Sequence, residues 1–250
     1  MSAYSYFADF YDGLTENVEY EKRADYLLQL FERHHHQPGV TLDLACGTGS
    51  LTIALAKRGV DIFGADASSD MLSIAAQKAD EAGFSLLLLH QKMQNLKLYG
   101  QIDTCLCTLD SINHLSSEKD VIRTFRNISR YLSDDGLFVF DANTVFKHEN
   151  VLGEECFVFD TDRVFCAWQN HYTPQQHRVT ITLDLFVPEG NTYRRYTEQF
   201  DELAYPREAM TEMLRQGGLE PVAVYDDLSF TAPKPDSQRE IYVVRKIRNE

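Results

Sequence analysis

The stretch Leu42-Asp43-Leu44-Ala45-Cys46-Gly47-Thr48-Gly49-Ser50 joins a short apolar run to the start of a helical pattern through a turn with two glycines. Gly47 and Gly49 have no side chain that keeps a ligand away from the backbone, and a helix that begins after them offers unpaired N–H groups. A glycine turn alone is weak evidence, because a tight strand-to-helix connection without a ligand uses the same residues.

Asp66 supplies a second point of contact, because it ends the next predicted strand within Gly64-Ala65-Asp66-Ala67-Ser68. An acidic residue at about this separation from a glycine turn holds ribose hydroxyls in doubly wound folds. The carboxylate could instead cap the following helix, but Ser68 or Ser69 is better placed for that task. The combined spacing therefore favours a nucleoside site between the glycine turn and Asp66.

Short β-rich runs alternate with helical patterns from Val40 to about Asp141, which is typical of repeated βαβ units around a parallel sheet. The predicted strands are Val40–Leu44, Asp61–Asp66, Ser85–Leu89, Ile102–Leu109 and Gly136–Asp141. The predicted helices are Tyr20–Arg33, Ser50–Arg58, Ser69–Ala82 and Ser117–Tyr131. The chain then closes with a helix at 206–218 and two strands, Glu220–Tyr225 and Arg239–Lys246.

Between about Asn143 and Tyr205 the pattern changes to long alternating strands, separated by turns such as Pro188-Glu189-Gly190-Asn191. Its aromatic residues would form plain core or one wall of a substrate site. They are Phe157, Phe159, Phe165, Trp168, Tyr172 and Phe186. The predicted fold is therefore α/β: a doubly wound, Rossmann-like, mostly parallel seven-stranded sheet with an inserted antiparallel β lobe. The expected parts are a cofactor-binding α/β domain at 1–142 with a helical cover at 1–38, the lobe at 143–205, and a closing helix and strands at 206–250.

The composition is that of an ordinary globular protein, with 250 residues of which 44% are hydrophobic and 25% charged. No apolar run approaches the roughly 20 residues of a membrane span, and the first residues lack the pattern of a signal peptide, so we expect a cytoplasmic protein without a membrane partner. The formal net charge of −14 argues against nucleic acid, whose binding depends on clustered Lys and Arg. The expected partner is a small-molecule substrate, and the expected state is a monomer or homodimer.

Neither the cysteines nor the histidine run predicts a metal site. The five cysteines include no Cys-x-x-Cys, so reduced thiols are expected. His34, His35 and His36 are consecutive at the end of a predicted helix and point in different directions, without a Cys or carboxylate at ligand spacing. A solvated helix terminus is the simpler interpretation.

The glycine turn resembles the first motif of the class I S-adenosylmethionine-dependent methyltransferases, which typically reads acidic-x-Gly-x-Gly-x-Gly. Here Asp43 supplies the acidic residue, and Ala45 replaces the first glycine. The chain is most similar to a small-molecule or aminodeoxysugar N-methyltransferase-like subgroup with Cys-Gly-Thr-Gly at this turn. Three further segments carry the resemblance over nearly the whole chain: Tyr6-Phe7-Ala8-Asp9-Phe10-Tyr11-Asp12, Gly64-Ala65-Asp66-Ala67-Ser68 with Met71-Leu72, and Asp110-Ser111-Ile112-Asn113-His114-Leu115.

The resemblance implies S-adenosylmethionine as the cofactor and assigns residues to it. The turn residues would surround its methionine moiety, Asp66 would take both ribose hydroxyls, and Ala67 and Met71 would line the adenine. The full set of implied cofactor residues is Asp43, Ala45, Gly47, Gly49, Asp66, Ala67, Met71, Lys92, Met93 and Asp110.

One departure from the subgroup follows the third predicted strand. The subgroup usually has Gln-Asp-Met there, with the acidic side chain facing the adenine amino group, whereas this chain has Gln91-Lys92-Met93. Lys92 offers only donors and cannot accept that hydrogen bond. Either the backbone of Lys92 and Met93 contacts adenine alone, or the affinity for the cofactor is lower.

His114 and Tyr11 are the catalytic candidates. An amine acceptor must lose a proton before it attacks, and polar residues that follow the strands, His114, Asn113 and Asp110, are placed to help. In the aminodeoxysugar N-methyltransferases that the chain resembles, a histidine occupies the matching place in a Ser-x-x-His-Leu segment, and Tyr11 matches an N-terminal tyrosine. The alternative is that His114 packs in a loop and Tyr11 is one of many aromatic residues that cover the cofactor.

Three functions remain open on the sequence alone. They are methyl transfer to a small-molecule amine or hydroxyl, methyl transfer to RNA or protein, and cofactor binding without transfer. An RNA enzyme should show a basic surface interleaved with aromatic residues, and none is visible. A nicotinamide dehydrogenase is disfavoured, because Gly-x-Gly-x-x-Gly requires glycine where the chain has Thr52. Methyl transfer to a small molecule is the leading hypothesis.

Overall fold

Strands and helices alternate along the chain, of which the computed structural model describes residues 7–15 and 18–248. The helices outside the lobe are α1 Ala8–Leu14, α2 Tyr20–Arg33, α3 Ser50–Lys57, α4 Ser69–Glu81, α5 Glu118–Tyr131 and α7 Arg207–Gln216, with a short 3₁₀ turn η2 at Met93–Asn95. The strands there are β1 Thr41–Leu44, β2 Ile62–Asp66, β3 Leu88–His90, β4 Ile102–Cys107, β5 Leu132–Asn143, β10 Leu219–Asp226 and β11 Arg239–Lys246. Ser68 and Ser117 start α4 and α5, because each side chain accepts a hydrogen bond from a backbone N–H of the first turn.

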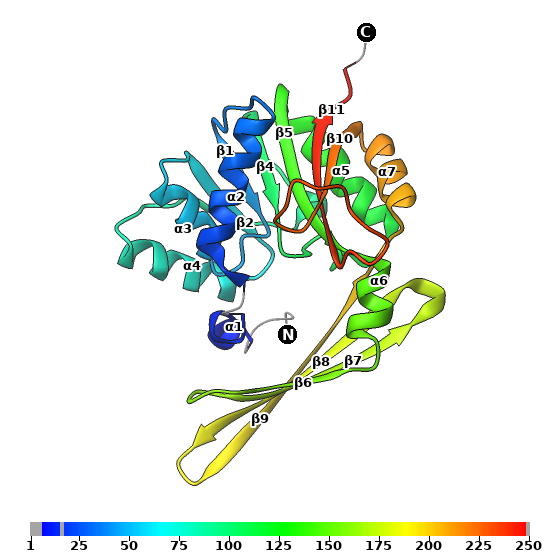
Figure 1. The fold of residues 1–250 in the computed structure, drawn as a ribbon. Coiled ribbons are helices and arrows are strands. Elements are labelled where there is room, and N and C mark those ends of the chain that lie inside the picture. The colour runs from blue at the N-terminus through cyan, green and yellow to red at the C-terminus, as the bar shows by residue number, and fades with distance from the viewer. Residues whose placement is uncertain (1–6, 16–17, 249–250) are drawn as a thin grey trace.

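Within the described residues these strands form one seven-stranded sheet in the order β10-β11-β5-β4-β1-β2-β3. Strands β1 to β5 pair in parallel, while β11 is antiparallel to both β5 and β10. Figure 1 shows helices on both faces of the sheet. The prediction of a doubly wound, mostly parallel sheet is confirmed. Tyr6 of the N-terminal motif lies outside the described residues.

Two apolar layers hold the helices to the sheet. Phe125 of α5 packs on one face with Phe138 of β5, and α7 adds to the same layer. Leu30 of α2 and Leu55 of α3 pack on the other face with Val139, the next residue along β5. Successive residues of a strand point to opposite faces, so β5 serves both layers. Burying each such side chain contributes roughly 1.5–3 kcal/mol.

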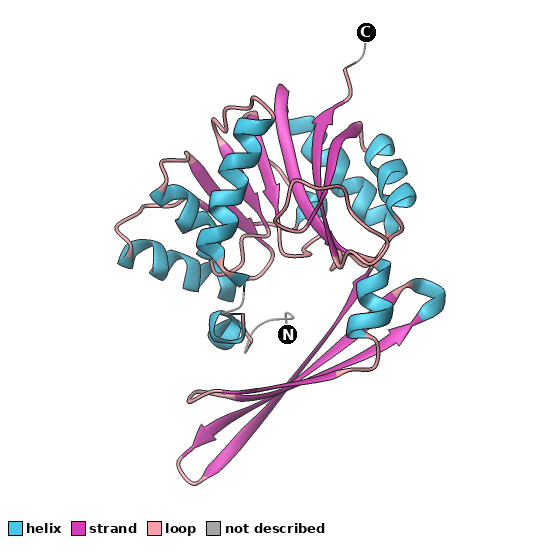
Figure 2. Cartoon of the chain, in the orientation of Figure 1, coloured by secondary structure: helices cyan, strands magenta, loops and turns pink. Residues whose placement is uncertain are grey.

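The lobe is a four-stranded antiparallel sheet in the order β6-β7-β8-β9. Its strands are β6 Cys156–Asp160, β7 Phe165–Thr173, β8 Arg178–Glu189 and β9 Thr192–Leu203. The short helices before and within it are α6 Val145–Lys147, the π-helical turn η3 His148–Leu152 and the 3₁₀ turn η4 Pro174–Gln176. Figure 2 shows the lobe as long strands next to one edge of the α/β part. The predicted inserted antiparallel sheet is thus present.

The two faces of the lobe have different contacts. One face packs in an apolar cluster with α1 and with Met71 of α4, and this cluster includes Phe159, Trp168 and Tyr172. On β8, Asp184 alternates with residues of that face and lies on the other one. Phe165 and Phe186 also lie there and contact each other, with ring centroids 6.1 Å apart. The aromatic residues that the sequence groups together therefore divide between the two faces.

Two local predictions are wrong. The third strand is Leu88–His90 rather than Ser85–Leu89, because this edge strand pairs with β2 over only three residues. His36 is not solvated: the end of α2 packs against β4, and its buried ring places Nε2 2.7 Å from Thr104 Oγ1. Across the described ranges, no helix is both long and apolar enough to cross a membrane.

Candidate functional site

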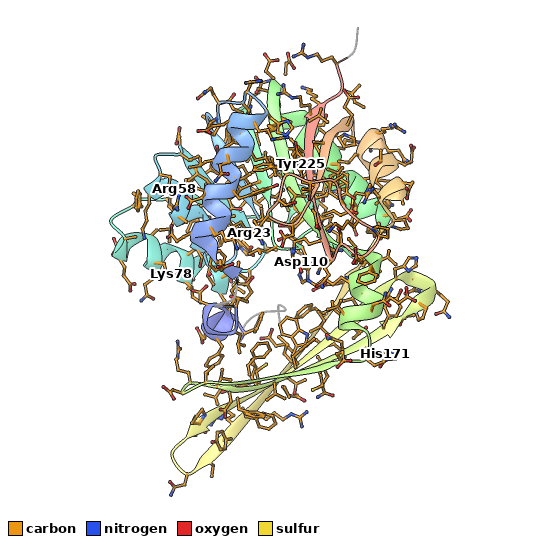
Figure 3. The ribbon with its side chains drawn as sticks, viewed as in Figure 1. Arg23, Arg58, Lys78, Asp110, His171 and Tyr225 are labelled. Carbon is orange, nitrogen blue, oxygen red and sulfur yellow. The ribbon has the colours of Figure 1, made fainter. Side chains whose placement is uncertain are left out.

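The predicted site residues follow the ends of β1 to β4, which meet at one edge because these strands run parallel. Figure 1 shows this edge turned toward the lobe, with α1 beside it. In Figure 3, Asp110 and Arg23 are labelled at this edge, one from the loop after β4 and one from α2. The edge therefore brings together side chains from distant parts of the chain.

The turn after β1 places three residues in the left-handed backbone region: Ala45, Gly47 and Gly49 have φ of 63°, 54° and 74°. A β-carbon on Gly49 would lie 3.0 Å from that of Ala75, so glycine lets α3 approach α4 closely. A β-carbon on Gly47 would meet nothing within 4 Å, so the turn is open there to a ligand. Ala45 holds a conformation that costs an L-residue about 1–2 kcal/mol. Its N–H donates to Ala65 O at 2.7 Å.

Asp66, at the end of β2, accepts hydrogen bonds from two backbone N–H groups. Gly47 N donates to Oδ2 at 2.9 Å, and Ser68 N donates to Oδ1 at 2.8 Å. Each carboxylate oxygen can accept another hydrogen bond, so the group fits two ribose hydroxyls. Burial raises the pKa of Asp66, and the backbone donors oppose that shift. Because Ser68 caps α4, the alternative role of Asp66 as the N-cap does not apply.

Asp43, at the end of β1, is a buried carboxylate. Its Oδ2 accepts from Thr52 Oγ1 at 2.6 Å, and burial raises its pKa to about 6. Its partner in the described part of the chain is thus a neutral hydroxyl. A positively charged group of a ligand would lower the cost of ionising such a carboxylate. Thr52, the residue that breaks the dehydrogenase motif, therefore has a structural role beside the site.

The remaining cofactor candidates outside the turn follow β2 and β3. Ala67 is exposed, and its carbonyl accepts from His90 Nε2 at 2.9 Å, which joins the ends of these strands. Met71 is buried in the cluster that α1 and the lobe share. Lys92 is exposed at the start of η2, while Met93 is half-buried against the main core. Lys92 thus brings a cation, and not an acceptor, to the end of β3.

Asp110 belongs to a network of charged and amide side chains. Its carboxylate accepts from Asn143 Nδ2 at 2.6 Å and from Arg239 Nη2 at 3.2 Å. Arg239 also donates to Asp141 at 2.5 Å, and Asp141 accepts from the N–H of Asp110 at 2.7 Å. A ligand contact through the Asp110 side chain would have to share these partners.

Asn113 joins three segments of the chain. Its Nδ2 donates to Asn143 O at 3.1 Å and to Leu203 O at 2.9 Å. Its Oδ1 accepts from Asn143 N at 2.9 Å, and its own carbonyl accepts from Leu203 N at 2.8 Å. The loop after β4, the end of β5 and the end of β9 are therefore fixed to one another.

His114 follows Asn113 directly and contacts the lobe. Its Nε2 lies 3.7 Å from Glu202 Oε1, and its ring centroid is 5.3 Å from that of Phe200. The side chain is 29% exposed. His114 also lies close enough to Asp66 to lower the pKa of that carboxyl. It thus lies in contact with the lobe at the same edge of the sheet as Asp66.

Tyr11, the second catalytic candidate, lies on α1. Its ring packs edge-to-face on Phe7 with centroids 5.4 Å apart, and Phe7 N donates to Glu198 of β9 at 2.9 Å. Burial raises the pKa of Tyr20, and a hydrogen bond with Tyr11 is among the contacts that oppose the rise. These contacts of Tyr11 and those described for His114 involve different residues.

Comparison with known proteins identifies the class. The family model described as "Methyltransferase domain" matches residues 41–136. A solved S-adenosylmethionine-dependent methyltransferase from Clostridium acetobutylicum ATCC 824 is 32% identical, covers 98% of this chain and 99% of its own, and has a TM-score of 0.88. This chain belongs to the S-adenosylmethionine-dependent methyltransferases.

The methyltransferase also has relatives that are known from their sequences. YqeM of Bacillus subtilis (strain 168), which carries the name of a methyltransferase, is 32% identical over 244 residues, or 97% of either chain. Glycine/sarcosine N-methyltransferase of Halorhodospira halochloris is 28% identical over 247 residues, which are 96% of this chain and 88% of the relative. A dTDP-3-amino-3,6-dideoxy-alpha-D-glucopyranose N,N-dimethyltransferase of Streptomyces fradiae is 28% identical over 136 residues, 54% of this chain and 52% of its own.

Glu202 is a residue of the candidate site that the sequence analysis missed. It is 4% exposed, accepts from Asn143 Nδ2 at 3.1 Å and lies 3.5 Å from His148 Nε2. Burial alone would raise its pKa, but His148, His114 and Asn143 together lower it to about 2. A signal was present in the strand pattern, because Glu202 pairs with the apolar Val179 and so lies on the buried face of the lobe.

Proposed function

We propose that this methyltransferase transfers the methyl group to an amine of a small molecule, with His114 as the group that accepts the proton. The contact of His114 with the buried Glu202, made from the loop after β4 at the edge of the sheet where Asp66 ends β2, carries the proposal. An amine is favoured over a hydroxyl because the relative named for glycine and sarcosine matches 96% of this chain and another is named for an aminodeoxysugar nucleotide, whereas the O-methyltransferase among the relatives, named for magnesium-protoporphyrin, matches only 41%. An amino sugar is the narrower proposal, since the Cys-Gly-Thr-Gly turn resembles that subgroup.

We infer that the cofactor lies along the ends of β1, β2 and β3. Asp66 has acceptor capacity for both ribose hydroxyls, and Gly47 leaves the turn open beside it. Asp43 would meet the positively charged amino group of the methionine moiety. Contacts to the rest of the cofactor are proposed for Ala45, Gly49, Ala67, Met71, Lys92, Met93 and Asp110.

The protein contributes position and a proton acceptor to this reaction. The bound cofactor supplies a methyl group on a positively charged sulfur. A protonated amine has no lone pair for the attack, so a neighbouring base that removes its proton raises the reactive fraction. His114 becomes positively charged in this step, and the buried carboxylate of Glu202 and the half-buried carboxylate of Asp66 stabilise that charge. We further propose that the lobe, 143–205, bounds the acceptor, while 1–142 and 206–250 hold the cofactor.

A substrate screen that measures release of S-adenosylhomocysteine tests the proposal. The panel contains glycine, sarcosine and aminodeoxysugar nucleotides, with the matching hydroxy compounds as controls and with RNA and unfolded protein as the other acceptor classes. We expect turnover with at least one amine and none with its hydroxy analogue. Methylation of RNA or protein in preference to every amine would overturn the proposed acceptor class.

A further inference from the structure

The carboxylate of Glu202 lies between two imidazole rings. His114 Nε2 faces its Oε1 at 3.7 Å, and His148 Nε2 faces its Oε2 at 3.5 Å, beside the 3.1 Å hydrogen bond from Asn143. The first two distances are those of ion pairs and exceed hydrogen-bond length, and such contacts often shorten when an acceptor binds. We propose that Glu202 is a positioning residue that directs Nε2–H of His114 to itself, so that Nδ1 is the ring nitrogen that receives the proton of the acceptor.

The backbone holds His114 and Glu202 at fixed places relative to each other. Asn113, the residue before His114, exchanges two hydrogen bonds with Leu203, the residue after Glu202. Both bonds are 2.8–2.9 Å long, and Asn113 is buried. These two hydrogen bonds form a clamp between Asn113 and Leu203. The positions of His114 and Glu202 therefore depend on this clamp as well as on their own flexible side chains.

His148 fixes Glu202 from the other side. Its Nδ1 lies 2.9 Å from His177 O, and a carbonyl only accepts, so Nδ1 carries a hydrogen. Nε2 then faces Glu202 Oε2 at 3.5 Å, and both side chains are buried. This contact and the hydrogen bond from Asn143 limit the orientation of the Glu202 carboxylate.

This arrangement rests on the proposed function and determines the path of one proton. The amine N–H proton passes to Nδ1 of His114, and the freed lone pair forms the new N–C bond. The C–S bond of the cofactor breaks, and its electron pair stays on sulfur. The hydrogen on Nε2 remains there, hydrogen-bonded to Glu202, which stays ionised throughout. The Nδ1 proton is lost to water after the product leaves.

The tautomer of His114 is a direct test that needs no acceptor. The full-length protein is labelled with ¹⁵N-histidine, and its ring ¹⁵N shifts are measured at pH 8.5. The signals of His114 among the eight histidines are identified by their loss in His114→Asn. We expect the Nε2–H tautomer in the wild type and a mixture of both tautomers in Glu202→Gln. The Nδ1–H tautomer in the wild type, or an unchanged pattern in Glu202→Gln, would overturn the proposal.

A matched control is available in the same lobe. Asp184→Asn also removes a buried carboxylate, but Asp184 pairs with Arg195 at 2.7 Å on the opposite face. This variant should leave the His114 shifts as they are; if it changes them as much as Glu202→Gln does, the effect is a general loosening of the lobe and the proposal is wrong.

Kinetics on the acceptor found in the screen add a second measure. Glu202→Gln should lower kcat by about 10- to 100-fold, the size of effect seen when the hydrogen-bond partner of a metal-bound histidine is removed, with cofactor affinity unchanged. Glu202→Asp keeps the charge and should recover part of that loss. Equal losses in the two variants would contradict a role for the charge. The proposed function is judged separately, by His114→Asn, so the two ideas can fail independently.

Discussion

The edge of the sheet has two halves, whose carboxylates have opposite kinds of partners. The cofactor half, named after the ligand proposed for it, contains the turn after β1 and the end of β2, and its carboxylates, Asp43 and Asp66, bind hydroxyl or backbone N–H groups. The acceptor half, also named after its proposed ligand, contains Asn143, Glu202 and Asp110, whose side chain binds Asn143 although a cofactor contact is also proposed for it. Here carboxylates bind cations, imidazoles and amides. Burial raises the pKa of Asp43 to about 6, whereas the pKa of Glu202 is lowered to about 2. A positively charged group of a ligand would stabilise the carboxylates of the first half, whereas side chains of the protein stabilise those of the second.

The largest expected effect concerns the acceptor half. His114→Asn removes the proposed proton acceptor and should slow methyl transfer by about 10²–10⁴-fold. Calorimetry should show nearly unchanged cofactor affinity, because the cofactor half is untouched. A loss of only a few fold would reduce His114 to a positioning role, and wild-type turnover would assign proton removal to another group.

The next effect concerns the cofactor half. Asp66→Ala removes the carboxylate from the proposed ribose contact and should weaken cofactor binding by about 2 kcal/mol or more, or about 30-fold. Ser68→Ala is the control, since it removes the cap of α4 and about 1 kcal/mol of stability while keeping the carboxylate. If calorimetry finds equal affinity losses in the two variants, helix stability explains the result and the ribose assignment is wrong.

The opposite pKa shifts predict opposite dependences of stability on pH. Glu202 has a folded-state pKa of about 2 against 4.5 when unperturbed, so its contribution is present above about pH 4.5 and is lost as pH falls toward 2. Asp43 has a folded-state pKa of about 6 against 3.8, so it destabilises the fold above pH 6 and ceases to do so toward pH 4.

Urea unfolding between pH 3 and 8 measures both contributions in the absence of cofactor. Glu202→Gln should be less stable than the wild type at pH 7, with the difference shrinking below pH 4.5. Asp43→Asn should gain relative stability at pH 8 and lose that gain near pH 4. If the free energy of unfolding of each variant differs from that of the wild type by the same amount at every pH, the opposite pKa shifts of Glu202 and Asp43 are wrong.

The smallest expected effect is that of Tyr11→Phe, which keeps the ring contact with Phe7 and removes only the hydroxyl. If the hydroxyl orients the acceptor, the rate should fall by up to about 10-fold, consistent with loss of one hydrogen bond. Cofactor affinity should remain the same. A fall in cofactor affinity instead would place Tyr11 in the cofactor half.

The local structure of the cofactor half could be predicted because its signals lie close together in the sequence. Gly47 and Gly49 take the left-handed backbone that glycine favours, and Ser68 is a preferred N-cap before a helical pattern. The acceptor half is different: Asp110 and Arg239 are 129 positions apart, and charged residues in a strand are ordinarily exposed. The burial of His36 could not be predicted for the same reason, since its partner Thr104 is 68 positions away.

The clamp made by Asn113 has a consequence for the order of folding. Its side chain bonds residues 30 and 90 positions away, whereas the bonds of Asp66 reach 19 and 2 positions. Closing a longer loop costs more chain entropy, so contacts between distant residues tend to form later. During synthesis from the N-terminus, Asp66 is also made well before Leu203. A growing chain therefore completes the contacts of Asp66 early, whereas His114 is held against Glu202 only after β9 has left the ribosome and docked.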